Sequence, residues 1–144
     1  MDEKYWIIVR TGEAEKRAIE YCSKEILKKI VPVIEITRGR KITKENVISY
    51  PFEKRLNVLK QAFANQIIAI DVTSEDALSS AETDFLYSPQ NGYKNWIDFL
   101  LDIKKENVFQ DIVPAILMNF DDDDFEYKMI QTVRGAGYIL KCED

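Results

Sequence analysis

Short apolar segments alternate along this chain with longer segments that carry apolar residues on one face only. The short segments are rich in isoleucine and valine, contain few polar residues and are typical of buried strands. On this pattern we predict five strands, at residues 5–10, 31–36, 66–72, 112–118 and 138–142.

The segments between these strands have the spacing of amphipathic helices. An apolar residue recurs at every fourth position from Ala18 to Ile30, which places these residues on one helical face. The predicted helices cover residues 13–30, 51–63, 93–106 and 121–134. The acidic run 121–124 is expected to cap the last helix rather than to bind a metal. Residues 73–92 are expected to form a long irregular connection, because they contain several polar breaks and Pro89.

The alternation βαβαβαβαβ predicts one α/β domain over residues 1–144 with a parallel five-stranded sheet. Two architectures fit: a partial TIM-barrel-like fold and an open, doubly wound flavodoxin-like sheet. The partial barrel is favoured because the predicted elements end on a strand with no helix to cover it. It is also favoured because the segments 31–36 (Val-Pro-Val-Ile-Glu-Ile) and 113–118 (Val-Pro-Ala-Ile-Leu-Met) resemble each other.

Composition and charge limit the classes of function. Histidine is absent, which removes histidine general bases, histidine-containing triads and histidine-ligated zinc. The net charge of −5 argues against a non-specific nucleic-acid binder, which is usually basic. Two cysteines make no disulfide framework, no apolar run is long enough to span a membrane, and the N-terminus lacks signal-peptide features. We therefore expect a cytoplasmic protein, with Cys22, Trp6 and Trp96 in its core.

Two carboxylates interrupt apolar strands near their carboxyl ends, Glu35 and Asp71. A carboxylate in an apolar setting is costly unless it is paired or hydrogen-bonded. Both architectures bring the ends of these strands to one edge of the sheet, so the pair is a candidate for catalytic acid and base or for ligands of a divalent metal. The structural alternative is an ion pair with Arg10 or Lys141.

Basic and small polar residues follow the same strand ends. The segment Arg10-Thr11-Gly12 opens the first helix, where free N–H groups attract an anion and arginine adds a bidentate donor. The loop 37–41 adds three cations, so a phosphate or carboxylate ligand is indicated, with a merely solvated basic loop as the alternative. The candidate ligand-binding residues are Arg10, Thr11, Gly12, Arg38, Arg40, Asn119 and Lys141.

Several of these strand motifs resemble the Beta protein family of phages and bacteria. The matching residues are Tyr5, the turn Arg10-Thr11-Gly12-Glu13, the strand Ile30-Val31-Pro32-Val33-Ile34-Glu35-Ile36 and the segment Ile70-Asp71-Val72. The resemblance covers the first half of the chain in sequence and the second half in pattern only. It implies a complete or incomplete α/β barrel in a phage-related or defence-associated protein, and it assigns no reaction.

Carried over residue by residue, the resemblance marks Arg10, Gly12, Glu13, Glu35 and Asp71. Family members are about twice as long as this chain, and their length is roughly that of one complete barrel. This implies a half-barrel that pairs with another copy, a fragment, or a subunit whose other half lies on a separate chain.

We expect a binding or interaction module whose anionic, phosphate or nucleotide-like ligand lies at the carboxyl edge of the strands. The alternative is a metal-dependent enzyme acting on phosphoesters or nucleotides, with Glu35 and Asp71 holding the ion. A divalent metal is the one cofactor that these residues suggest.

The end of the chain predicts a partner. The strand from Tyr138 to Cys142 is expected to lie uncovered at the edge of the sheet. Because an exposed strand edge invites pairing, it is a candidate seam for a second copy or another subunit.

Overall fold

The protein is built on a parallel four-stranded sheet with the order β1-β2-β5-β6. We describe it from a computed structural model, which covers residues 3–117, 130–133 and 137–140. The strands are β1 (Tyr5–Arg10), β2 (Ile30–Ile36), β5 (Ile67–Val72) and β6 (Asp111–Pro114). The mixed α/β class with a parallel sheet is confirmed, and the first three predicted strands match the observed ones to within one residue.

Helices connect these strands. They are α1 (Glu13–Tyr21), α2 (Lys24–Lys28), α3 (Glu53–Ala62), α4 (Ala81–Tyr87) and α5 (Gln90–Glu106). The single helix predicted over residues 13–30 is wrong, because the chain is extended at Cys22 and Ser23 between α1 and α2. The Ser23 hydroxyl accepts a hydrogen bond from the Ile26 N–H at 3.3 Å, a cap that starts α2 anew. Within the described residues, no helix is long and apolar enough to cross a bilayer.

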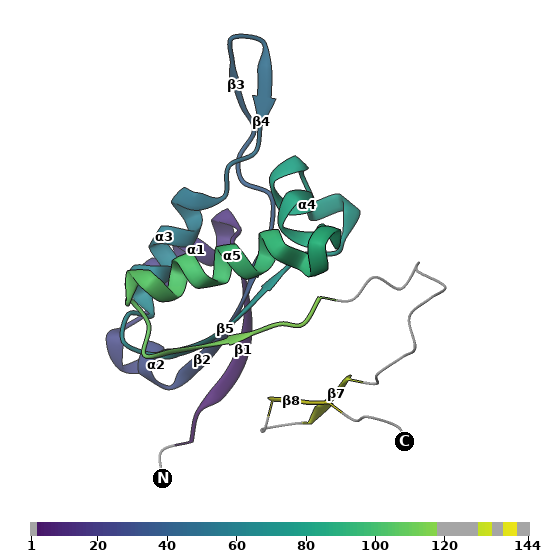
Figure 1. The fold of residues 1–144 in the computed structure, drawn as a ribbon. Coiled ribbons are helices and arrows are strands. Elements are labelled where there is room, and N and C mark those ends of the chain that lie inside the picture. Colours follow the sequence, from purple (N-terminus) through teal and green to yellow (C-terminus); the bar gives the residue numbers. More distant parts are fainter. Residues whose placement is uncertain (1–2, 118–129, 134–136, 141–144) are drawn as a thin grey trace.

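One face of the sheet is buried by the helices. Ile34, Ile36, Ile68 and Ile70 of the two central strands have no exposed surface. Figure 1 shows α1, α3 and α5 on the same side of the sheet, and the core joins these strand residues to side chains from all five helices: Ile19, Leu27, Leu56, Leu59, Phe63, Leu86, Trp96 and Ile103. The predicted apolar stripes of α3 and α5 are therefore confirmed, and Cys22 packs against this core.

The opposite face of the sheet carries the alternate side chains. Trp6 pairs in register with Val31, and Ile8 with Val33. Trp6 is 45% exposed and Ile8 is 68% exposed, so the prediction that Trp6 is a core residue is wrong. The reason is positional: β1 is an edge strand, and Trp6 alternates with the residues that face the helices. We call this the open face of the sheet.

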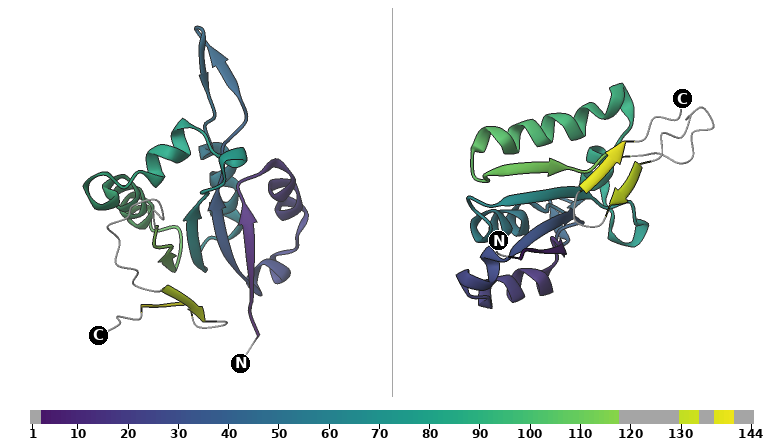
Figure 2. Two further views of the ribbon diagram at one scale, coloured as in Figure 1. Left: turned by 90° about the vertical axis from the view of Figure 1, so that its right-hand side faces the viewer. Right: turned by 90° about the horizontal axis from the view of Figure 1, so that it is seen from below.

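A β-hairpin projects from the connection between β2 and α3 (Figures 1 and 2). It consists of β3 (Ile42–Lys44) and β4 (Val47–Ser49), which pair antiparallel. Glu45 and Asn46 between them both have positive φ, at 50° and 62°, as a two-residue type I′ turn requires. The sequence pattern did not predict this hairpin.

The connection 73–92 is more ordered than predicted. It contains a short 3₁₀ helix (Asp76–Leu78) and α4. Helix α4 begins at the Ser80 cap, where the Ser80 N–H donates to the Thr83 hydroxyl at 2.8 Å. Non-helical backbone at Asn91, Gly92 and Tyr93 then separates this region from the regular part of α5.

The C-terminal predictions need correction. Residues 130–133, predicted to be helical, form strand β7 (Ile130–Val133), and it pairs antiparallel with β8 (Gly137–Leu140). The prediction of a fifth parallel strand is therefore wrong, because the parallel sheet has four strands and β8 belongs to a separate antiparallel pair. A seam for a partner at residues 138–142 stays a prediction. Glycines between two apolar runs indicate a helix end and a strand connection equally well, so the pattern was ambiguous here. Residues 121–124, proposed as helix caps, lie outside the described residues.

A close backbone approach at Gly39 ties the base of the hairpin to the body of the protein. The Gly39 N–H donates to the Tyr50 carbonyl at 3.0 Å, and a Cβ at position 39 would lie 1.6 Å from the Pro51 carbonyl oxygen. We predict that Gly39→Ala lowers the free energy of unfolding by about 2 kcal/mol, because backbone must move to admit the methyl group. Urea unfolding followed by circular dichroism measures this.

The matched control is Gly12→Ala, for which the nearest atoms to the added methyl belong to the carboxylate end of Glu15. That side chain can swing away, so we expect a change below about 0.5 kcal/mol. Equal losses in the two variants would contradict the steric account of Gly39.

Candidate functional site

Arg10, Glu35 and Asp71 form one row across three strands. Arg10 pairs in register with Glu35, and Glu35 with Asp71, so all three lie on the open face at its carboxyl end. Arg10 Nε donates to Glu35 Oε1 at 3.1 Å, and an Nη atom of Arg10 lies 3.7 Å from Glu75 Oε2. The structural alternative for Glu35, an ion pair with Arg10, is thus what the structure shows.

Asp71 has no cationic partner within 4 Å among the described residues. Burial raises the pKa of its carboxyl, and the charge of Glu35 adds to this. The Val72 N–H, which donates to Asp71 Oδ1 at 2.8 Å, offsets the increase in part. The charged form of the Asp71 carboxyl is therefore disfavoured in the folded protein.

The row is a limited set of metal ligands. Across the part of the chain that the structure describes, no group of three or more acidic or cysteine side chains comes together as a metal site. Glu35 already accepts a hydrogen bond from Arg10, and that cation would compete with a metal ion for the same oxygen. Metal binding by Glu35 and Asp71 stays a prediction.

Buried threonines join the strand ends beneath this row. Thr11 is 1% exposed, and its hydroxyl accepts from the Thr37 N–H at 2.9 Å and lies 3.2 Å from the Thr37 carbonyl, to which it can donate. Thr73, which follows β5, is also buried and caps the next turn by accepting from the Glu75 N–H at 3.1 Å. Thr11 therefore links β1 to β2 and presents no surface to a ligand.

The remaining predicted ligand residues do not come together at the row. Gly12 lies at the N-cap position of α1 without a side chain to cap it, and the guanidinium of Arg38 lies over the ring of Tyr50, 5.6 Å from its centre. Arg40 lines a large cavity. Asn119 and Lys141 lie outside the described residues.

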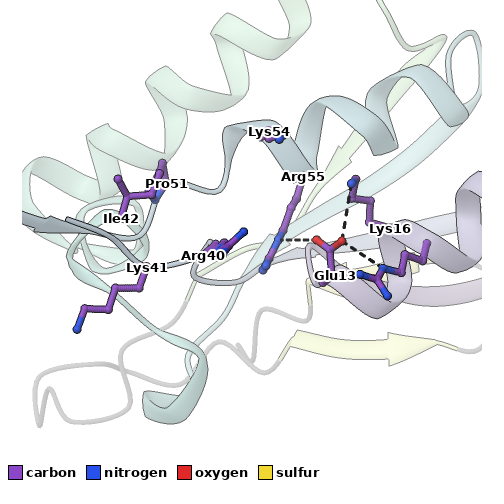
Figure 3. A pocket seen from close by; sticks show the side chains of 9 residues that line it. Glu13, Lys16, Arg40, Lys41, Ile42, Pro51, Lys54 and Arg55 are labelled. Carbon is purple, nitrogen blue, oxygen red and sulfur yellow. Dashed lines mark hydrogen bonds and ion pairs between the residues drawn. The ribbon is translucent and has the colours of Figure 1, made fainter. Parts of the chain in front are cut away.

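This cavity, which we call the basic cavity, measures about 790 Å³ and lies at the outer side of the sheet's carboxyl edge. Its wall comes from the first turns of α1 and α3 and from the segment that leads into the hairpin (Figure 3). Six of its residues are cationic and one is acidic; the lining residues are Glu13, Lys16, Arg17, Arg40, Lys41, Ile42, Pro51, Lys54 and Arg55.

Two helix N-termini add to the positive potential. Neither Gly12 before α1 nor Phe52 before α3 supplies a side-chain cap, so N–H groups of both first turns keep the partial positive charge of a helix start. The helices pack side by side. In a chain with a net charge of −5, this is a marked concentration of positive charge.

Glu13 is the single carboxylate of the basic cavity. One of its oxygens lies 3.3 Å from Arg17 Nε and 3.8 Å from Lys16 Nζ, and the other lies 3.7 Å from Arg55 Nε (Figure 3). Desolvation acts to raise the pKa of Glu13, but these three cations outweigh it and lower the pKa below its ordinary value. Glu13 therefore stays ionised at neutral pH.

Sequence reasoning missed Lys16, Arg17, Lys54 and Arg55. A signal was present: the tripeptide Glu-Lys-Arg occurs at 15–17 and again at 53–55, each time near the start of a helix. These charges looked like ordinary solvated helix faces, because nothing in a linear pattern shows that α1 and α3 are neighbours.

Fold and site together define an α/β protein with a parallel sheet and a cationic cavity at the carboxyl edge of its strands. The chain is similar to Protein beta of Enterobacteria phage P4, at 27% identity over 136 residues. The match takes in 92% of this chain and 35% of the phage protein, so the chain spans about a third of that relative's length. The expected relationship to the Beta protein family is confirmed as a distant one. No family model matches the sequence, and no solved structure matches.

The charge state of Asp71 makes stability depend on pH. Its pKa in the folded protein is above the unfolded value of 3.8, so the folded state binds the proton more tightly and ionised Asp71 costs stability at neutral pH. We predict that Asp71→Asn raises the melting temperature at pH 7. The gain should shrink as the pH falls through the raised pKa and vanish below 3.8, as calorimetry from pH 3 to pH 8 would show.

Asp111→Asn is the matched control. Asp111 lies on the neighbouring strand and likewise accepts from the N–H that follows it, Ile112 N at 2.9 Å, but its side chain is exposed. We expect no pH-dependent gain there. A gain of the same size in both variants would contradict the role of burial at Asp71.

Proposed function

We propose that this protein is a binding module for a phosphate-bearing ligand, which it holds in the basic cavity. The observation that carries the proposal is the convergence of six cationic side chains, from α1, α3 and the segment before β3, on one cavity. Its volume of about 790 Å³ falls in the range of small-molecule sites. The position also agrees with the general location of ligands in parallel α/β proteins, outside the carboxyl ends of the strands.

The chemistry of the lining favours phosphate. Arginine binds phosphate through paired N–H donors and lysine adds mobile point charge, and the cavity supplies three of each. Its described lining contains no aromatic ring on which a base could stack, so recognition would rest on the phosphate groups. The row Arg10–Glu35–Asp71 contributes less to this function, because Arg10 is already paired with two carboxylates.

A double variant of α3 tests the proposal. We predict that Lys54→Gln/Arg55→Gln weakens the binding of inorganic pyrophosphate by at least about tenfold at low ionic strength, since two of the six cations are lost. Isothermal titration calorimetry measures the affinity.

Lys104→Gln/Lys105→Gln provides the control, because it removes the same charge from the end of α5, away from the cavity. This variant should bind pyrophosphate like the wild type. If the wild type does not bind pyrophosphate, or if both double variants weaken binding equally, the basic cavity is not the site.

We further propose that the sheet is part of a TIM-barrel-like fold rather than of a doubly wound one. The four strands follow one another in chain order, whereas a doubly wound sheet reverses its order at a switch point. Helices lie on one face, and on the other face the alternate residues stand in rows, as they do inside a barrel. Closure of the barrel would require further strands, supplied by a longer protein or by a second copy.

The cytoplasmic location expected from the sequence also stays a prediction.

Trp6 is a native reporter of closure. It lies on the open face, whereas Trp96 is buried and donates from Nε1 to the Ala115 carbonyl at 3.1 Å. The fluorescence of Trp6 is obtained as the difference between the emission of the wild type and that of Trp6→Phe. We predict that acrylamide quenches this fluorescence poorly, because barrel closure would bury Trp6. Shielding that depends on protein concentration would indicate a second copy. Ready quenching at every concentration would contradict closure by a second copy of this chain.

A further inference from the structure

The six cations of the basic cavity divide into two groups. Lys16, Arg17 and Arg55 surround the Glu13 carboxylate at 3.3 to 3.8 Å, and we call them the occupied group. The free group is Arg40, Lys41 and Lys54, which have no carboxylate within 4 Å among the residues that the structure describes. In Figure 3, Arg40 lies between Lys41 and Arg55, and residues of both groups line the same cavity.

The Glu13 carboxylate occupies the position of an anionic ligand. Carboxylate and phosphate oxygens accept charge-assisted hydrogen bonds from the same donors with similar geometry. A side chain on which three cations converge within a cavity therefore marks a place where a phosphate would be bound if the carboxylate moved aside. Glu13 is at the first position of α1 and about half-exposed, so it can turn outward without disturbing the core.

These observations bear on the number of phosphates in the ligand. A single phosphate is satisfied by the free group and has no need to compete with Glu13. A ligand that fills the whole cavity must place a second anionic group on the occupied group, where it replaces the carboxylate. The cavity volume of about 790 Å³ is ample for such a ligand.

Building on the proposed function, we infer that the basic cavity selects ligands with two or more linked phosphates, and that the second phosphate displaces Glu13 from Lys16, Arg17 and Arg55. Glu13 thereby acts as an internal competitor that lowers the affinity for pyrophosphate but leaves that for a single phosphate nearly unchanged. The residue sets selectivity and takes part in no reaction.

The test compares inorganic phosphate with inorganic pyrophosphate by titration calorimetry on wild type, Glu13→Gln and Glu20→Gln. Glu13→Gln should strengthen pyrophosphate binding by about five- to tenfold, and phosphate binding by less than about twofold. Glu20→Gln is the matched control, because Glu20 lies on the same helix and 3.8 Å from Lys16 Nζ but does not line the cavity. It should change either affinity by less than about twofold.

A second variant keeps the inference testable if Glu13→Gln folds poorly. Arg17 is 71% exposed, so Arg17→Gln should fold normally. It should weaken pyrophosphate binding by about fivefold while leaving phosphate binding unchanged, because Arg17 belongs to the occupied group.

The outcomes separate the two proposals. If Glu13→Gln changes both affinities equally or changes neither, Glu13 is not displaced and the inference on linked phosphates fails, while the binding function stands. If the wild type binds neither anion, the proposed function itself fails.

Discussion

The pairing of β2 with β5 is the constraint on which the rest of the structure depends. Both strands are nearly continuous runs of isoleucine and valine, and Ile34, Ile36, Ile68 and Ile70 lose all their exposed surface where the helices cover them. A one-residue shift in register would turn these side chains to the open face, so burial itself selects the register. That register places Glu35 beside Asp71 and, through β1, beside Arg10.

Chain order across the sheet then decides where chemistry can occur. Because β1, β2, β5 and β6 are neighbours in sequence order and parallel, every connection crosses in the same direction. All helices that follow the strands therefore start at one edge, and α1 and α3 become neighbours with their first turns side by side. The basic cavity is a consequence of this adjacency, since four of its cations come from these two turns.

The charge distribution explains how an acidic protein can present a site for anions. The chain carries a net charge of −5, yet in the part that the structure describes, cations from three segments meet around Glu13 and the base of the hairpin. Gly39 contributes to this arrangement, because its close contact with Pro51 holds the segment with Arg40 and Lys41 against the start of α3. A flexible loop of the same composition would not hold those cations at the cavity.

The local sequence pattern was enough to predict the buried strands, the apolar faces of α3 and α5, and the strand-end position of Glu35 and Asp71. The reason is that strand alternation and helical spacing indicate directly which side chains are buried. It failed at Ser23 and at the hairpin around Asn46, where a few polar residues decide a helix start or a turn that hydrophobic spacing does not encode. It failed at residues 130–133, because the glycines that follow them in sequence suit a helix end and a strand connection alike. Only the tertiary structure decided that Thr11 is internal, that Trp6 faces outward and that Lys16, Arg17, Lys54 and Arg55 share one cavity. Those facts depend on which elements become neighbours, and the packing of the helices on the whole sheet determines these neighbours. The sequence by itself determines only which side chains each segment buries.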